Sequence, residues 1–292
     1  MSDATQVLRD FAPVRAFFIG IDSDGCVFDT MEIKHKQCFG PMFIKHFGLE
    51  PVAQPAREVW DFVNLYSKTR GANRFQALVR ALQLLRERRE VVAAGFPVPD
   101  ATALAAWVAR ETRLSNATLQ KEVAGGNRAL APALAWSNAV NQAVERTATN
   151  VPPFPCVRES LQKMGGRADV AVVAQAPTEV LVREWEEHDI RKYVQLVAGQ
   201  ELGTKTDHLR LAAGGKYPPD HILMIGDALG DLKAAKVNHA LFYPILPGRE
   251  AASWENLHRE TLDRFFAGTY AGACEERFVK EFEASLPEKP DW

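Results

Sequence analysis

FFIGIDSDGCV, residues 17–27, is the stretch that determines the expected fold, because an apolar run ends in two carboxylates and a glycine. An uninterrupted apolar run of this length is typical of a buried parallel strand, which is apolar on both faces. In open α/β sheets, ligands bind where the chain leaves the carboxyl end of such a strand. We therefore expect Asp22 at the strand end and Asp24 on the following turn, which Gly25 permits without steric strain.

Asp22 and Asp24 are candidate ligands for a divalent cation. Two carboxylates one residue apart repel each other unless a cation or a proton lies between them. Mg²⁺ prefers oxygen ligands, keeps several waters and accepts a substrate phosphate oxygen. The alternative interpretation is an ordinary turn, since Asp, Ser and Gly are all common turn formers.

The composition indicates a globular protein of one large or two modest domains. The chain has 292 residues, of which 47% are hydrophobic and 25% are charged. Its net charge of -2 gives no general attraction to nucleic acid or to an anionic membrane. We therefore expect neither nucleic acid nor membrane as a partner.

The cysteines and the first residues favour a cytoplasmic location. Four widely spaced cysteines form no CxxC pair, so the sequence suggests neither a zinc site nor a redox pair, and we expect free thiols. Residues 1–15 contain charges and no long apolar run, which does not fit a signal peptide. No apolar stretch approaches the length that spans a bilayer.

The part of the chain from residue 32 to about residue 150 has a helical pattern and no convincing strand. Leu78, Leu82 and Leu85, for example, are spaced for one face of a helix. This block is much longer than an ordinary connection between two strands. We therefore expect an all-helical domain, residues 34–149, inserted into a core made of residues 1–33 and 150–292.

Strands and helices alternate after the proline-rich stretch 151–155. Apolar runs at 169–174, 194–197, 221–227 and 240–245 follow the first strand, with helical segments between them. This alternation predicts an α/β core with a central parallel sheet of about five strands. If the first and fourth strands are neighbours, Asp22, Asp24 and Asp227 meet at one edge, and three carboxylates together are costly without a metal.

Four segments, in this order, resemble the motifs of the haloacid dehalogenase (HAD) superfamily of phosphohydrolases. DSDGCV at 22–27 resembles the first motif, Asp-x-Asp-Gly-(Thr/Val)-(Leu/Val), and VAVVAQ at 170–175 resembles the second. Lys205 resembles the lysine of the third motif, and GDALGD at 226–231 resembles the acidic fourth. The insertion lies where this family places a helical cap of the first type, as in its phosphoglycolate phosphatase and β-phosphoglucomutase members. The resemblance covers residues 14–33 and 151–246 and implies a Rossmann-like core.

The resemblance also implies a role for each motif residue and Mg²⁺ as the cofactor. Asp22 would be the nucleophile and a metal ligand, and Asp24 would be the general acid and base, with its backbone carbonyl as a second ligand. Asp227 would be the third protein ligand. Asp231 would orient a metal-bound water or Lys205, and Lys205 would neutralise the transferring phosphoryl group.

The second motif departs from the family pattern at Ala174. The family usually has Ser or Thr at this strand end, where the hydroxyl donates a hydrogen bond to the phosphoryl group. The candidate phosphate-binding residues are therefore Ala174 and Gln175, with Thr178 or nearby backbone N–H groups as other possible donors. Loss of one such donor lowers a rate by about 10²–10³.

The inserted domain is expected to select the substrate. A cationic turn between two of its helices, together with two residues near its start, contains the candidate substrate-binding residues, which are Lys34, His35, Arg70, Asn73 and Arg74. The alternative for the turn is a solvated connection without a ligand.

The expected function is a Mg²⁺-dependent phosphohydrolase that removes phosphate from a small phosphorylated metabolite through an aspartyl-phosphate. Asp24 favours phosphate-ester chemistry over dehalogenation, because only a leaving oxygen needs a proton. The alternatives are a phosphomutase that uses the same site and a non-catalytic binding module, which Ala174 favours. The sequence identifies neither the substrate nor the oligomeric state.

Overall fold

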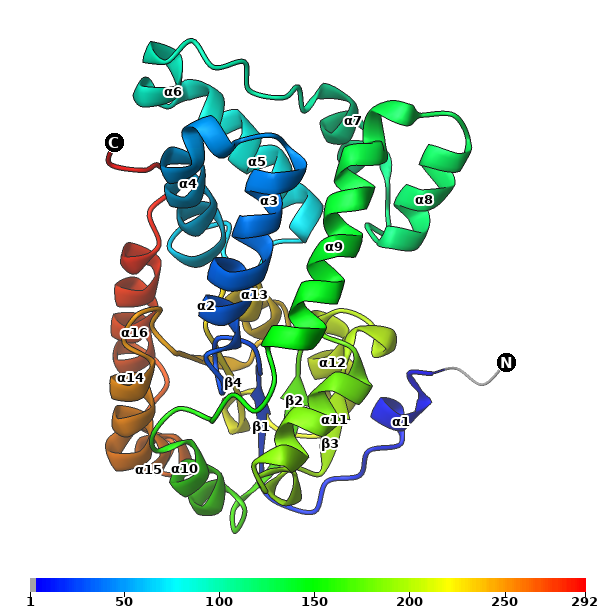
Figure 1. Cartoon of the computed structure of the whole chain (residues 1–292). Coiled ribbons are helices and arrows are strands. Elements are labelled where there is room, and N and C mark those ends of the chain that lie inside the picture. The colour runs from blue at the N-terminus through cyan, green and yellow to red at the C-terminus, as the bar shows by residue number, and fades with distance from the viewer. Residues whose placement is uncertain (1–3) are drawn as a thin grey trace. The chain divides into compact units, whose positions relative to one another are not determined.

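The computed structural model describes residues 4–292, and these residues divide into two compact units (Figure 1). The core unit holds the described chain up to Thr30 together with Asn150–Leu286. The helical unit holds Met31–Thr149 together with Pro287–Trp292. The sequence predicts these last six residues as part of the core, but in the structure they belong to the helical unit.

The core unit is built on a five-stranded parallel sheet with the strand order β3-β2-β1-β4-β5. This sheet confirms the predicted α/β fold class with a central parallel sheet. Its strands are β1 (Phe17–Ile21), β2 (Ala168–Val173), β3 (Leu196–Ala198), β4 (Ile222–Gly226) and β5 (Leu241–Pro244).

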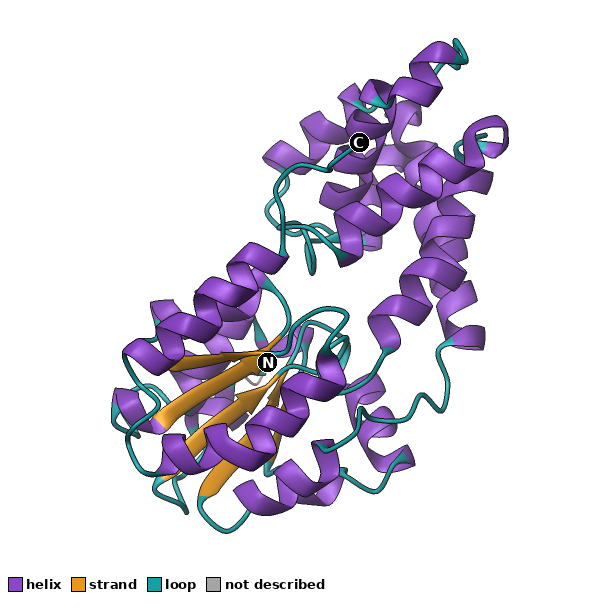
Figure 2. Ribbon diagram, turned by 90° about the vertical axis from the view of Figure 1, so that its left-hand side faces the viewer, coloured by secondary structure: helices purple, strands orange, loops and turns teal. Residues whose placement is uncertain are grey.

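Helices cover both faces of the sheet (Figure 2). Because successive strand residues point to opposite faces, Ile19 and Ile21 pack into one buried cluster and Phe18 into another. The helices of this unit are α1 (Gln6–Arg9), α10 (Val157–Met164), α11 (Thr178–Glu187), α12 (Lys205–Ala212), α13 (Leu229–Val237), α14 (Glu250–Asn256), α15 (Leu262–Phe266) and α16 (Ala273–Ser285), with the π-helix η7 (Leu257–Thr261) and the 3₁₀ turns η4 (Arg191–Tyr193), η5 (Gln200–Leu202) and η6 (Pro219–His221).

The register of β1 and β4 brings their following residues to the same edge of the sheet. Ile21, the last residue of β1, is paired with Ile225 of β4. Parallel neighbours run in the same direction, so the residues that follow both strands emerge side by side. Asp22 and Asp227 are those residues, and the site described below forms at this edge.

The helical unit contains no strand among the residues that the structure describes. Its buried cluster is rich in aromatic side chains and includes Trp60, Trp107 and Trp136, all fully buried. Its helices are α2 (Thr30–Ile33), α3 (Gly40–His46), α4 (Ala53–Leu65), α5 (Arg74–Glu87), α6 (Arg89–Ala93), α7 (Thr102–Arg110), α8 (Asn116–Ala124) and α9 (Ala131–Thr147), with the π-helix η1 (Lys34–Phe39) and the 3₁₀ turns η2 (Glu50–Val52) and η3 (Arg128–Leu130).

The segment Pro287–Trp292 packs against helices of the helical unit. The backbone N–H of Lys68 donates to the carbonyl of Pro287 (3.2 Å). The Trp292 ring lies edge-on to Phe62, with the centroids 5.3 Å apart, and the Arg88 guanidinium lies 4.2 Å from the Trp292 ring centroid. Within residues 4–292, no helix combines the length and the apolar character that crossing a membrane requires.

Candidate active site

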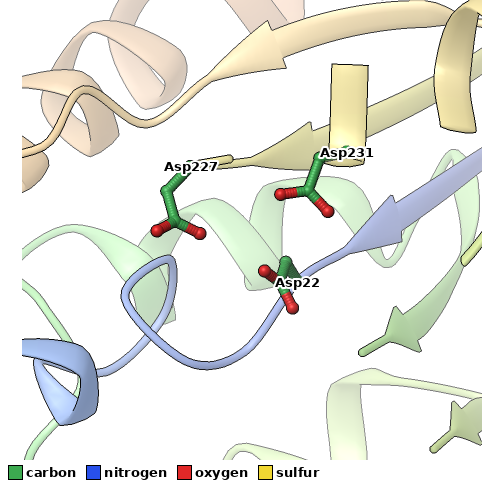
Figure 3. Close-up of side chains that lie close together, drawn as sticks. All are labelled: Asp22, Asp227 and Asp231. Carbon is green, nitrogen blue, oxygen red and sulfur yellow. The ribbon is translucent and has the colours of Figure 1, made fainter. Parts of the chain in front are cut away.

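Three carboxylates meet at the carboxyl edge of the sheet (Figure 3). Asp22 follows β1, Asp227 follows β4 and Asp231 lies in the first turn of α13. One oxygen from each carboxylate lies within 4.8 Å of the others, and all three side chains are buried. The structure therefore brings together three acidic residues from the first and fourth motifs.

Lys205 joins two of these carboxylates. Its Nζ lies 2.7 Å from Oδ2 of Asp22 and 2.6 Å from Oδ1 of Asp231. Lys205 is the first residue of α12, whose N-cap is Thr204. Burial on its own would lower the pKa of Lys205, but Asp22 and Asp231 outweigh this effect and raise it, so the ammonium stays charged.

The charges of the cluster favour a bound cation. Burial raises the pKa of Asp22 well above its usual range, and the neighbouring Asp231 and Asp227 raise it further, against the opposing effect of Lys205. The pKa of Asp231 is raised by the same causes, burial first and then Asp227. One ammonium cannot balance three buried carboxylates, so a hard divalent cation such as Mg²⁺ fits this set of oxygen ligands.

The loop after Asp22 is held by bonds on both sides. The backbone N–H of Ser23 donates to Oδ1 of Asp22 (2.8 Å), and Nε1 of Trp185 donates to Oγ of Ser23 (3.0 Å). Gly25 has φ 75°, a left-handed conformation that glycine adopts without strain, and its N–H donates to the carbonyl of Phe28 (2.8 Å). The chain thus turns back immediately after the two aspartates.

Asp24 is only partly buried and accepts a hydrogen bond from the hydroxyl of Thr30. Thr30 is not among the residues that the sequence predicts for the site, because no motif or periodicity connects it with Asp24. Only the turn at Gly25, which returns the chain toward Asp24, indicates that a residue a few positions later can reach this carboxylate.

Asp231 has two roles in the structure. Its Oδ1 accepts from Lys205, and its Oδ2 accepts from the backbone N–H of Ala228 (3.1 Å), the residue that precedes α13. The second bond stabilises the start of the helix, where a negative charge is also favoured by the helix dipole. Asp231 therefore connects the start of α13 to Lys205.

The strand end of the second motif presents no side-chain hydroxyl. Ala174 is 2% exposed, and its N–H donates to the carbonyl of Ala198 (3.0 Å). Nε2 of Gln175 donates to the carbonyl of Gly203 (3.0 Å), and the Thr178 hydroxyl donates to Glu201 (2.9 Å). The polar side chains next to Ala174 thus bind the loop before Lys205.

Four of the five candidate substrate-binding residues of the inserted domain make contacts inside the helical unit. His35 is buried and accepts from Nε1 of Trp60 (3.2 Å), and Arg70 donates to the carbonyl of Leu65 (3.0 Å). Asn73 caps α5 by accepting from the N–H of Phe75, and Arg74 donates to Oγ of Ser137 (3.0 Å). Lys34 is the first residue of η1.

Neither a family model nor a curated protein matches this chain. Several solved structures are similar to it at low identity. One is a haloacid dehalogenase-like family hydrolase from Xanthomonas campestris, with 10% identity and a TM-score of 0.47, covering 88% of this chain and 94% of that one. Another is a predicted phosphoglycolate phosphatase from Haemophilus somnus, with 16% identity and a TM-score of 0.47, covering 80% and 86%. A third is a haloacid dehalogenase-like family hydrolase from Streptococcus pneumoniae, with 11% identity and a TM-score of 0.41, covering 82% and 90%.

Proposed function

We propose that this protein is a Mg²⁺-dependent phosphohydrolase of the haloacid dehalogenase type, which removes phosphate from a small phosphorylated metabolite. The observation that carries the proposal is the convergence of Asp22, Asp227, Asp231 and Lys205 at one edge of the sheet. These residues come from three of the four sequence motifs. A purely structural role does not explain why three buried carboxylates lie together when one lysine pairs with only two of them.

Asp22, the backbone carbonyl of Asp24 and Asp227 would hold the metal, and Asp231 would orient Lys205. When bound, Mg²⁺ supplies positive charge that favours the ionised carboxylates and neutralises a phosphate oxygen. Burial raises the pKa of Asp22, and the positive charge of a bound cation would lower it again. Asp22 is then available as a carboxylate nucleophile.

The reaction has two steps that use Asp22 and Asp24. In the first, an oxygen of Asp22 attacks phosphorus, the bond from phosphorus to the leaving oxygen breaks, and Asp24 gives its proton to that oxygen. In the second, Asp24 takes a proton from water, and this water attacks the phosphorus of the aspartyl-phosphate. The bond to Asp22 breaks and free phosphate leaves, while Lys205 neutralises developing charge in both steps.

The helical unit would select the metabolite through residues such as Lys34, His35, Arg70, Asn73 and Arg74. We also propose a cytoplasmic location, which the four free cysteines support. A reducing compartment suits thiols that form no disulfide among residues 4–292.

Hydrolysis of p-nitrophenyl phosphate and of a panel of phosphorylated metabolites, with free phosphate as the readout, tests the proposal. We expect turnover that requires Mg²⁺ and that Asp22→Asn abolishes, because an amide is a poor nucleophile and a weak metal ligand. Asp220→Asn is the matched control, since Asp220 is exposed and lies just before β4. Near-normal turnover in Asp22→Asn would exclude the covalent route.

Ala174 favours a second candidate, a binding module that does not turn over its ligand. The strand end lacks the hydroxyl that the phosphatase motif supplies, and Gln175 and Thr178 bind neighbouring loop groups instead. Under this candidate, the same assay gives no free phosphate from any compound, although inorganic phosphate still binds in the presence of Mg²⁺.

A further inference from the structure

We propose that Glu201 is a positioning residue that places Lys205 by fastening the loop before α12 to the loop after β2. The inference rests on the proposed function, because it assigns Lys205 a part in phosphoryl transfer. Glu201 lies in η5, between β3 and α12, and belongs to none of the four motifs.

The carboxylate of Glu201 bonds twice to Thr178, the first residue of α11. Its Oε2 accepts from the backbone N–H of Thr178 (3.1 Å) and from the Thr178 hydroxyl (2.9 Å). The N-cap residue of α11 is Pro177, whose side chain makes no cap bond. Glu201, from a different loop, therefore accepts the backbone N–H at the start of this helix. A negative charge at this position also interacts favourably with the helix dipole.

Two further bonds join the same pair of loops. The N–H of Gln200 donates to the carbonyl of Ala176 (3.0 Å), and Nε2 of Gln175 donates to the carbonyl of Gly203 (3.0 Å). The residues from Ala174 to Thr178 and from Gly199 to Gly203 are thus held together along their length.

The two loops approach so closely that only glycine fits at position 199. A Cβ added to Gly199 would lie 2.4 Å from Oγ1 of Thr178 and 2.7 Å from the carbonyl oxygen of Ala176. The contact between Glu201 and Thr178 is therefore one part of a packed junction.

Lys205 comes shortly after this junction in the sequence. Gly203 and Thr204 separate it from η5, and Thr204 caps α12 by accepting from the N–H of Asp207. The direction of the first turn of α12, and hence the place of the Lys205 ammonium between Asp22 and Asp231, depends on where this loop is held. Glu201 is exposed, and the N–H groups of Glu201 and Thr178 together with the Thr178 hydroxyl lower its pKa against the opposing effect of desolvation, so its carboxylate stays ionised.

The test compares Glu201→Ala and Glu201→Gln with the wild type, with Glu179→Ala as the matched control. Glu179 is an exposed acid in the first turn of the same helix α11 and has no part in the junction. We expect Glu201→Ala to lower kcat for p-nitrophenyl phosphate in saturating Mg²⁺ by about 10- to 100-fold, with little change in KM. Glu201→Gln keeps an acceptor oxygen for Thr178 and should restore most of kcat.

A second readout measures the position of Lys205 without any turnover. Reductive methylation followed by mass spectrometry gives the labelling rate of Lys205, whose side chain is 14% exposed, against that of Lys192, which is 53% exposed. Glu201→Ala should label Lys205 several-fold faster while Lys192 is unchanged, and Glu179→Ala should change neither.

The two readouts separate the inference from the proposed function. An inactive wild type would contradict the phosphohydrolase, and faster labelling of Lys205 in Glu201→Ala would still support the positioning role. If Glu201→Ala leaves the labelling of Lys205 unchanged, or keeps the kcat of an active wild type, the positioning role is wrong.

Discussion

The ammonium of Lys205 lies 2.7 Å from Oδ2 of Asp22, although the two residues come from the third and the first motif and are far apart in the sequence. The same nitrogen lies 2.6 Å from Oδ1 of Asp231. The single positive charge of Lys205 therefore forms ion pairs with two of the three buried carboxylates, and the cluster has an excess of negative charge. This excess is the physical basis of the predictions on metal binding and on catalysis.

Asp227→Asn should weaken Mg²⁺ binding. Removing one of the buried carboxylates takes away a charged ligand and also relieves repulsion within the cluster. We expect Mg²⁺ at about 100 times its dissociation constant to stabilise the wild type by about 2.7 kcal/mol. In Asp227→Asn the same Mg²⁺ concentration should stabilise much less, whereas the metal-free variant should be at least as stable as the wild type.

Thermal unfolding with and without Mg²⁺ measures this effect, and Asp220→Asn serves as the control. An equal Mg²⁺-dependent shift of Tm in Asp227→Asn and in the wild type would place the metal elsewhere.

His208 should make the protein less stable in mild acid. It is fully buried, and burial, followed by the charge of Lys205, lowers its pKa from 6.5 to about 4. Between these values the unfolded chain binds a proton that the folded chain does not bind. The free energy of unfolding therefore falls as the pH drops from 6.5 toward 4, by roughly 3 kcal/mol over the whole window.

Urea unfolding at about pH 5 and about pH 7 checks this prediction. His208→Gln should reduce the difference between the two conditions, whereas His239→Asn, at an exposed position, should leave it as in the wild type. The same pH dependence in His208→Gln and in the wild type would show that other groups cause it.

Ala174→Ser should raise kcat toward a generic phosphate ester by about tenfold, a share of the usual effect of such a donor. The added oxygen is small, so the packing strain should be modest at this buried strand end. A matched control is Ala198→Ser, the same change at the end of the neighbouring strand β3. A rate that is unchanged or lower in Ala174→Ser would mean that backbone groups already supply the donor.

Trp292→Ala should lower the local stability of the helical unit around Arg88. This guanidinium is 7% exposed, lies against the Trp292 ring and pairs with Glu58 and Glu90. Loss of the ring removes a cation–π contact worth about 0.5–2 kcal/mol. Amide hydrogen exchange should therefore speed up in the helix ends near Arg88, and Lys289→Ala should have no such effect. Unchanged exchange in Trp292→Ala would show that the segment contributes little to the unit.

The sheet and the acidic cluster were predictable from local patterns, because the apolar runs before Asp22 and Asp227 mark two strand ends. Parallel pairing of β1 and β4 then brings these residues together. The convergence of Asp231 and Lys205 on the same edge follows from their places at the starts of helices α13 and α12, which follow the parallel strands β4 and β3 of the same sheet.

Contacts between separate loops were not predictable in this way. The bonds from Thr30 to Asp24 and from Thr178 to Glu201 join residues that share no periodicity. The packing of residues 287–292 on the helical unit depends on single side chains, above all Trp292 and Arg88, whose partners are far away in sequence. Such contacts are set by tertiary packing, which composition and spacing do not encode locally.

The most direct test of the central claim is to detect a phosphoryl group on Asp22. The wild type is mixed with Mg²⁺ and p-nitrophenyl phosphate, quenched in acid during turnover and digested, and the peptide that contains Asp22 is analysed by mass spectrometry. We predict a phosphoryl adduct on Asp22 that disappears on incubation before quenching and never forms in Asp22→Asn. Sustained release of phosphate with no adduct on Asp22, or an adduct on another residue, would contradict the account.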